Sequence, residues 1–286
     1  MVTIENLNFK YKSGDDFALK DINLTIKKKE FIGVIGNSGA GKTTLTCALN
    51  GIIPHHYPGD FYGMVKINGL DTVEVKPEEL SLFVGSVFQD IDGQMVASVV
   101  EDEILFGLEN FGIPSEEIEK RLNDALETIG ISNLRYRSIS TLSGGQKQKV
   151  AIAAIVALRP SLLVLDEPTG ELDPMSSRQI FTMLKTLNED YDMTIVIVEQ
   201  KIMLLCEFAH RLLVMEKGCI VFDGPTRDVL THSRELENIG INVPRVVTLA
   251  TALKEKGIYS GPEPKDLDEA KIMIEKILEE AGRNRL

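Results

Sequence analysis

The chain has few cysteines, no long apolar run and a deficit of positive charge, and each shortage excludes a class of protein. Its three cysteines, Cys47, Cys206 and Cys219, form an odd set without metal-ligand spacing. We therefore expect reduced thiols in the core, not a disulfide framework or a zinc module. The densest apolar stretch, residues 150–158, has half of the roughly 18 residues that a membrane helix needs. We expect no membrane span.

Acidic residues outnumber basic ones by 43 to 31, which gives a net charge of -12. The electrostatic field of this negative charge repels nucleic acid and anionic lipid, so we expect no nucleic-acid partner. The N-terminus lacks a basic segment followed by an apolar stretch and a small-residue cleavage site. We therefore expect no secretory signal and an intracellular protein.

Hydrophobic periodicity predicts a mainly α/β chain. Alternating and β-branched segments at residues 2–9 and 19–26 predict two antiparallel strands at the N-terminus. The apolar run 31–35 predicts a buried strand. After residue 224 the pattern changes to two amphipathic helix candidates, residues 246–255 and 267–280. The second carries an apolar stripe of Leu267, Ala270, Ile274, Ile277 and Leu278. The other predicted elements are a helix from about residue 41 to 50, strands at 63–67, 82–87, 162–165 and 194–198, a helical insertion at 99–136 that includes a helix at 116–129, helices at 147–158 and 176–187, and a hairpin at 211–215 and 219–222.

The loop after the third strand has the composition of a phosphate-binding loop (P-loop). Its residues are Gly36, Asn37, Ser38, Gly39, Ala40, Gly41, Lys42 and Thr43. Glycines let successive backbone N–H groups point at phosphate oxygens, and the following helix presents its positive end to the same charge. We expect Lys42 to reach the β- and γ-phosphates, Thr43 to hold Mg²⁺ and Thr44 to add a hydroxyl nearby. The sequence thus predicts ATP and Mg²⁺ as cofactors.

A second candidate site lies where the apolar strand 162–165 ends in Asp166 and Glu167. Alone, a strand that ends in two acids is more often a solvated terminus. Beside a P-loop, Asp166 is expected to bind Mg²⁺ through a water, and Glu167 to polarise or deprotonate the attacking water.

A third element is the run Leu-Ser-Gly-Gly-Gln at residues 142–146, ahead of a predicted helix. Ser143 can cap that helix, and Gly144 and Gly145 clear a path for an anion, with Gln146 following. One nucleotide would not reach both helix starts within one compact subunit. This second phosphate site is therefore predicted to serve the ATP of a partner.

Together these motifs resemble the ATP-binding-cassette (ABC) ATPases, whose signature motif matches residues 142–146; the resemblance covers roughly residues 1–230. It implies a P-loop NTPase core of mixed sheet with an N-terminal antiparallel β subdomain, a helical signature subdomain and a small helical C-terminal extension. The implied domains are an ATPase domain at 1–231, with its helical subdomain at about 90–158, and the extension at 232–286. In that family, two ATPase subunits sandwich two ATPs.

Other site residues follow from the resemblance by position. Tyr11 resembles the aromatic that stacks on adenine, Gln89 resembles the glutamine that contacts Mg²⁺ and the attacking water, and Asp173 matches the loop that crosses the dimer interface. Their alternatives are a core aromatic, a surface polar residue and a helix cap. Gln200 stands where the family usually has a histidine that grips the γ-phosphate. Glutamine cannot carry the histidine's charge, so we expect slow hydrolysis at this site.

Residues 87–94 and 106–114 resemble the energy-coupling-factor transporter ATPases, which power uptake of vitamins or transition-metal ions. That implies a peripheral subunit at the cytoplasmic face of the membrane. It would dock on a membrane coupling protein through the groove near Gln89 and the segment 90–111, beside a substrate-binding membrane subunit and a second ATPase, identical or not. A soluble ABC ATPase, such as an iron–sulfur assembly factor, and the ATPase of a binding-protein-dependent importer remain alternatives. The extension could pack on the main domain or form a dimer contact.

Overall fold

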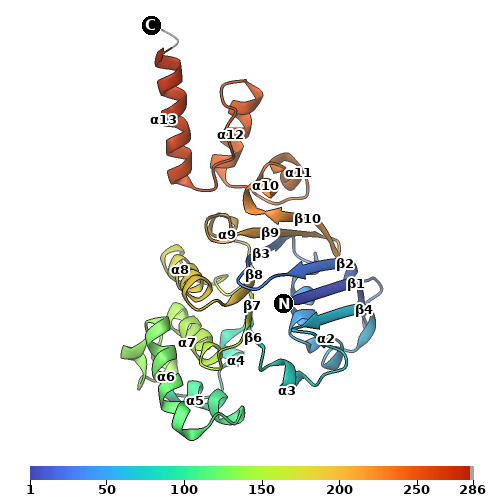
Figure 1. Cartoon of the computed structure of the whole chain (residues 1–286), viewed down its shortest axis with the longest axis vertical. Helices are drawn as coiled ribbons and strands as arrows, with labels where there is room; N and C mark the ends of the chain where they lie inside the picture. The colour runs from blue at the N-terminus through green and yellow to red at the C-terminus, as the bar shows by residue number, and fades with distance from the viewer. Residues whose placement is uncertain (284–286) are drawn as a thin grey trace.

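The structure is a computed structural model that describes residues 1–283, with side chains described through residue 279. Two sheets organise it (Figure 1). The smaller one is antiparallel, with the order β2-β1-β4-β5. Its strands are β1 (Val2–Tyr11), β2 (Leu19–Ile26), β4 (Gly59–Ile67) and β5 (Leu70–Asp71).

The larger sheet has six strands in the order β10-β9-β3-β8-β7-β6. They are β3 (Phe31–Gly36), β6 (Val84–Val87), β7 (Leu162–Asp166), β8 (Thr194–Val198), β9 (Arg211–Glu216) and β10 (Cys219–Pro225). All pairs are parallel except β9 with β10, which is an antiparallel hairpin at the edge. Every residue of β7 and β8 is buried, which explains their unbroken apolar runs. The carboxyl ends of these strands meet at one edge, where open α/β sheets bind ligands.

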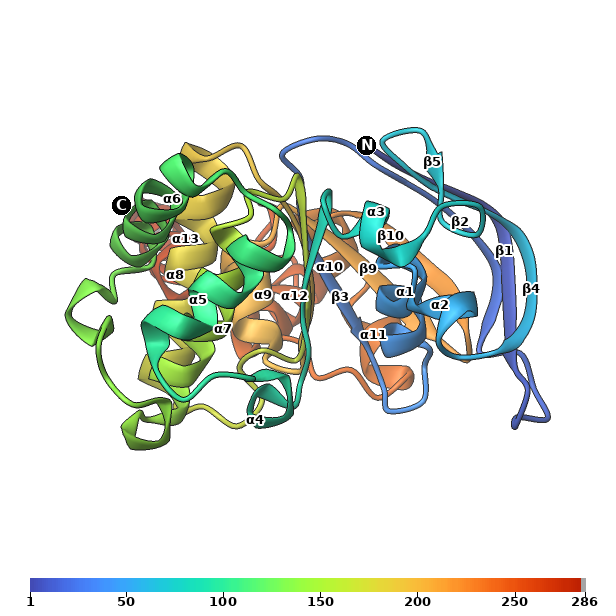
Figure 2. The same cartoon turned by 90° about the horizontal axis from the view of Figure 1, so that it is seen from below.

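Helices cover both ends of the molecule. Figure 1 places α5–α7 at one end of the long axis and α12 and α13 at the other, and Figure 2 shows the antiparallel sheet on the side opposite α5–α8. The helices are α1 (Lys42–Leu49), α2 (Ile52–His55), α3 (Pro77–Leu80), α4 (Ile91–Gln94), α5 (Val100–Asn110), α6 (Ser115–Ile129), α7 (Gly144–Val156), α8 (Pro174–Asp190), α9 (Ile202–Phe208), α10 (Thr226–Leu230), α11 (Ser233–Asn238), α12 (Arg245–Glu255) and α13 (Leu267–Arg283), with 3-10 turns at Ser132–Leu134 and Ile139–Thr141. None of the helices described is long and apolar enough to cross a membrane.

The longer predicted elements are confirmed, and the missed ones are short. Elements such as β5, α2, α3 and α4 span two to four residues. Hydrophobic periodicity cannot be detected in segments this short. The strand predicted at residues 82–87 begins only at Val84, because Leu82 is 51% exposed and lies in the preceding turn.

The cysteine prediction holds for two of the three residues. Cys47 and Cys206 are buried, and burial raises the pKa of Cys47 to about 11 and that of Cys206 to about 12. Both therefore remain protonated and unreactive at neutral pH. Cys219 is half-buried on the edge strand β10, so its assignment to the core was wrong.

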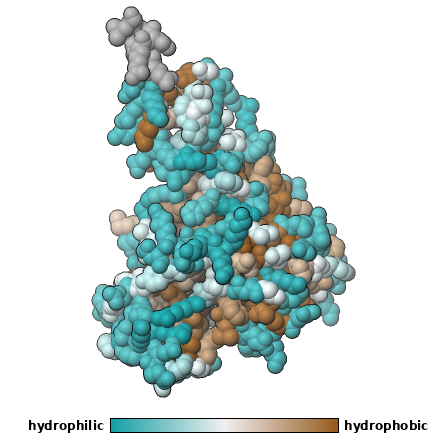
Figure 3. Space-filling model, in the orientation of Figure 1, coloured by the Kyte–Doolittle hydropathy of each residue, from teal (hydrophilic) through white to brown (hydrophobic). Residues whose placement is uncertain are grey.

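Only part of the stripe predicted on α13 packs, because Ala270 is buried and Ile277 half-buried while the other three residues are exposed. Ala270 and Met273 are buried, whereas Leu267, Ile274 and Leu278 are exposed by 71%, 41% and 65%. Figure 3 shows hydrophobic surface at this end of the molecule, below the grey atoms. The helix thus packs through one narrow edge and leaves apolar side chains on its surface.

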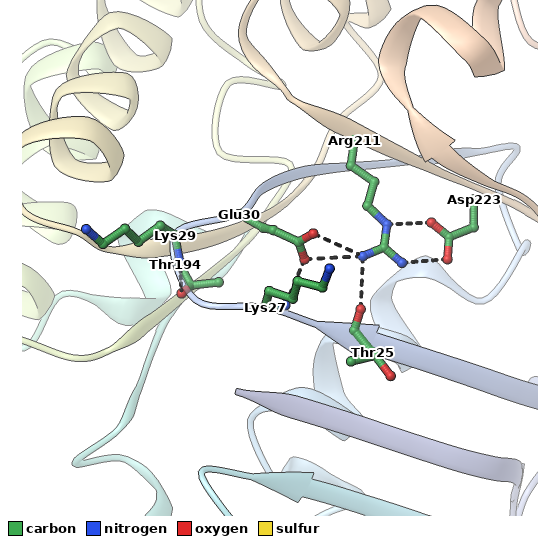
Figure 4. A network of polar contacts seen from close by, with 7 residues as sticks. All are labelled: Thr25, Lys27, Lys29, Glu30, Thr194, Arg211 and Asp223. Carbon is green, nitrogen blue, oxygen red and sulfur yellow. Dashed lines mark hydrogen bonds and ion pairs between the residues drawn. The ribbon is translucent and has the colours of Figure 1, made fainter.

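An arginine network joins the two sheets (Figure 4). Arg211 on β9 pairs with Asp223 on β10 through two hydrogen bonds of 2.5 and 2.6 Å. Its Nη1 donates to the Thr25 carbonyl on β2 at 2.9 Å and to Glu30 at 3.2 Å. The hydrogen bonds to Asp223 raise the pKa of Arg211. One guanidinium therefore holds three strands in register.

Arg211→Ala should lower the thermal midpoint by at least about 3 °C, since it leaves two carboxylates and a carbonyl without their shared donor. Calorimetry or thermal denaturation measures this. Arg159→Ala is the control, because Arg159 makes one exposed ion pair of 2.8 Å with Asp124. Exposed ion pairs contribute little to the free energy of unfolding. Equal shifts in the two variants would contradict the bridging role.

Candidate functional site

The loop from Gly36 to Lys42 curls around an ammonium group. Lys42 begins α1 and is 7% exposed, and its Nζ donates to the carbonyls of Gly36 at 2.7 Å and Asn37 at 3.0 Å. Gly41 has φ of 99°, and a Cβ there would lie 2.6 Å from the Ala18 carbonyl oxygen, so only glycine fits. The loop opens onto a cavity of about 240 Å³ lined by residues such as Ser38 and Gln200. A cationic group and a helix N-terminus at one cavity form a phosphate-binding arrangement.

Asp166 supplies an oxygen that the fold leaves unpaired. The residue ends β7 and is 7% exposed, and its Oδ1 has no hydrogen-bond partner among the described residues. Burial raises the pKa of Asp166, while hydrogen bonding from Thr43 and the charge of Lys42 act in the opposite direction. A buried carboxylate beside a hydroxyl fits a hard divalent cation such as Mg²⁺, which binds one or two carboxylates together with phosphates.

Within the described residues, no three or more His, Cys, Asp or Glu side chains gather in a group that could hold a metal ion by themselves. The assignment of Asp166 and Thr43 to a Mg²⁺ site stays a prediction, in which phosphate oxygens would complete the ligands.

Glu167 and Gln200 lie in direct contact. The Gln200 Nε2 donates to both Glu167 carboxylate oxygens, at 2.9 and 2.8 Å. Glu167 has φ of 49°, a left-handed backbone conformation that is uncommon for a residue with a side chain and that occurs often at functional sites. It lines a cavity of about 400 Å³ together with Gln89 and Gly144. A carboxylate held at the edge of a cavity by an amide can take a proton from a water there.

The predicted Ser143 cap of α7 is present, and the Gln146 side chain adds a second hydrogen bond to it. Ser143 Oγ accepts from the Gln146 backbone N–H at 3.4 Å, and the Gln146 side chain accepts from the Ser143 N–H at 3.0 Å, a reciprocal capping box. Ser143, Gly145 and Gln146 line a cavity of about 300 Å³. No lining residue is shared with the P-loop cavity. Each subunit thus presents two separate candidate phosphate sites.

Two residues assigned by position show contacts that the motifs did not predict. Tyr11 is half-buried, with its ring edge-on to Phe9 at 4.8 Å and its hydroxyl 3.1 Å from Thr44 Oγ1 on α1. Asp173 accepts from the N–H groups of Met175 and Ser176 at 2.9 and 3.1 Å, so it caps α8, the alternative left open for it. The Ser176 hydroxyl also lowers the pKa of Asp173.

Sequence reasoning missed three residues around the site. Ile239, far along the chain, accepts a 2.5 Å hydrogen bond from the Asn37 side chain of the P-loop. Glu199 and Lys201, which flank Gln200, hold the segment after Glu167. The only local signal for them was two charges directly after an apolar strand.

The family model of the ABC transporter matches residues 19–170 of the chain, which contain the P-loop, the signature and the Asp166–Glu167 pair. The chain belongs to the ABC transporter family. An energy-coupling factor transporter ATP-binding protein, EcfA2 of Caldanaerobacter subterraneus subsp. tengcongensis, is 38% identical to this ABC ATPase over 276 residues, 94% of this chain and 95% of its own.

Two solved structures share its fold. CbiO1 from Clostridium perfringens, described as part of the ABC transporter complex CbiONQ, has a TM-score of 0.74 and 32% identity over 87% of this chain and 97% of its own. The dimeric cassette MJ0796, in a post-hydrolysis state bound to ADP and Pi, has a TM-score of 0.67 and 29% identity over 79% of this chain and 99% of its own. The predicted family, its fold and its ATP hydrolase class are thereby confirmed.

The glutamine at position 200 should make this ABC ATPase slow. Gln200→His is expected to raise the single-turnover hydrolysis rate about 5-fold, since hydrogen bonds from a charged donor are stronger than those from an amide by about 1 kcal/mol. Rapid quench with stoichiometric ATP measures the step. An unchanged or lower rate would contradict the role given to residue 200.

Proposed function

We propose that this ABC ATPase is the ATP-hydrolysing subunit of an energy-coupling-factor type importer, at the cytoplasmic face of a membrane, powering uptake of a vitamin or a transition-metal ion. Its similarity over nearly the whole chain to EcfA2, and its structural likeness to CbiO1, support this class. The observation that carries the proposal is a candidate docking surface next to helix α4, which contacts both the strand end before Gln89 and the signature helix α7.

In the proposed site, the loop from Gly36 to Thr43 binds the phosphates, and Tyr11 lies beside the adenine. Thr43, Asp166 and Gln89 would hold Mg²⁺, which neutralises phosphate charge when bound with ATP. Glu167 takes the proton of the attacking water, and Gln200 orients Glu167 through its two hydrogen bonds.

A second ATPase subunit, identical or not, would complete the site. Its signature segment, equivalent to residues 143–146 here, would face the P-loop, because the two cavities of one subunit share no residue. We further propose that residues 1–231 form the ATPase domain, with its helical subdomain at about 90–158. Residues 232–286 would form an extension whose exposed Leu267, Ile274 and Leu278 offer a dimer contact.

The proposed docking surface lies along α5 and the loop that precedes it. Val96 and Phe106 are 62% and 51% exposed, and they line a hollow of about 260 Å³ together with Asp102 and Glu109. The surface is rigid, because the buried Glu103 carboxylate accepts from the N–H groups of Val96 at 3.0 Å and Ala97 at 2.7 Å. An apolar hollow with two acids fits a partner helix that carries apolar and basic side chains.

Helix α4 connects this region to the segment before Gln89 and to the signature helix α7. The Gln94 side chain accepts from the Phe88 N–H and donates to the Ser86 carbonyl, both at 3.1 Å, and so fixes the strand end that carries Gln89. Asp92 pairs with Lys147 on the signature helix α7 at 2.6 Å. A shift of α4 would therefore move Gln89 and the signature together, as coupling of hydrolysis to a membrane partner requires.

Affinity purification of the tagged chain from membranes of its own cell tests this function. We expect a polytopic membrane protein to co-purify and the complex to hydrolyse ATP. Phe106→Asp should abolish the association, because a buried charge would replace the apolar anchor. Val221→Asp, at a 41% exposed site on β10, is the matched control. Recovery in soluble complexes alone, or equal retention of both variants, would overturn the transport proposal.

A further inference from the structure

The residues on either side of Gln200 hold the segment that follows Glu167. Glu199 is 2% exposed, and its Oε1 accepts from the backbone N–H of Thr169 at 2.9 Å and from the Thr169 hydroxyl. Its Oε2 accepts from the N–H groups of Gln200 at 3.0 Å and Lys201 at 3.3 Å. One buried carboxylate therefore joins the end of β8 to the chain two residues beyond Glu167.

Lys201 makes a second connection to the same segment. Its Nζ donates to the carbonyls of Thr169 at 2.5 Å and Leu172 at 2.7 Å, and to Ser177 Oγ at 2.7 Å. Three acceptors use all three donors of an ammonium group. Among the ion pairs of the described residues, neither Glu199 nor Lys201 takes part. Both charges are thus used to hold backbone and hydroxyl groups in place.

Gln200 sits between these two connections and touches Glu167. The backbone N–H of Glu167 also donates to the Val198 carbonyl at 2.9 Å. Residues 167–172 and 198–201 are therefore joined at the Glu167 backbone, the Glu167 carboxylate, Thr169 and Leu172. Loss of either flanking residue would free the strand end that carries Gln200 to move relative to Glu167.

We propose that Glu199 and Lys201 are positioning residues for ATP hydrolysis, which hold residues 167–172 and Gln200 as one unit so that the Glu167 carboxylate stays aligned. The proposal rests on the proposed role of Glu167 as the base. It assigns a task in the reaction to these two side chains, and it separates hydrolysis from binding, because the hydrogen bonds of both side chains go to residues 169–177 and 200–201 and not to the P-loop.

Single-turnover hydrolysis and nucleotide affinity distinguish this role from general stability. Lys201→Met is expected to slow hydrolysis at least about 10-fold, by loss of hydrogen bonds from a charged donor, with ATP affinity within about 3-fold of the parent. Lys201→Arg should recover part of the rate. Glu199→Gln, which cannot accept two N–H groups at its amide end, should behave like Lys201→Met without loss of volume. Lys185→Met, at an exposed position on α8, is the control.

A double-mutant cycle decides whether the two residues act through Glu167. In a Glu167→Gln background, Lys201→Met should change the residual rate less than about 2-fold, since the aligned group is already gone. A full loss in that background, an ATP affinity that falls in parallel with the rate, or wild-type hydrolysis in both Lys201→Met and Glu199→Gln would overturn the proposal. Wild-type hydrolysis in Glu167→Gln alone would instead overturn the assignment of the base.

Discussion

Glu167→Gln is expected to lower the single-turnover rate of ATP hydrolysis by about 10²–10⁴-fold, the contribution of a positioned general base. The amide has the same shape but cannot take a proton from water. Its remaining carbonyl can still accept from Gln200, so the local structure should persist. ATP binding should stay within about 3-fold, because the proposed phosphate contacts lie at the P-loop and do not involve Glu167. Rapid-quench kinetics and equilibrium binding of a fluorescent ATP analogue measure the two effects.

The variant should also accumulate as an ATP-bound dimer, because in the proposed arrangement ATP binds between two subunits and would hold them together until it is hydrolysed. Size-exclusion chromatography with ATP and with ADP reports this state. Glu189→Gln, with a side chain 51% exposed at the end of α8, is the control and should behave as the parent does. A loss of rate below about 10-fold would exclude Glu167 as the general base.

Lys42→Ala is expected to reduce ATP affinity at least about 30-fold, since hydrogen bonds to charged groups contribute about 1.5–3 kcal/mol each. The ammonium is also the group around which the loop closes, through the carbonyls of Gly36 and Asn37. Its removal should therefore weaken ADP binding as well. Isothermal titration calorimetry with ATP and ADP measures both affinities.

Lys256→Ala is the control for the loss of one positive charge, because Lys256 is exposed at the end of α12. Raising the salt concentration should weaken ATP binding to this control and to the parent equally. If Lys42→Ala bound ATP as tightly as the control, the ammonium would be a structural support of the loop only.

The phosphate-binding elements could be predicted because each is encoded locally. The glycines from Gly36 to Gly41, the apolar strand that ends in Asp166, and the serine at the start of α7 produce their structures through backbone conformation, periodicity and capping. These effects act over a few residues. The fold class and the family followed from the same segments. The assignments of Glu167 as base and Gln89 as metal contact remain predictions.

Only the tertiary structure brought together residues that lie far apart in the chain. Gln200 reaches Glu167 across 33 positions, and Asn37 reaches Ile239 across 202. Periodicity and capping carry no information at such separations, because these contacts depend on the order of strands in the sheet and on loop paths. The contacts of Glu199 and Lys201 with Thr169 and Leu172 could not be predicted from the sequence for the same reason. The P-loop and the Asp166–Glu167 pair were therefore determined by the sequence itself, whereas the contact between Glu167 and Gln200 was decided by packing.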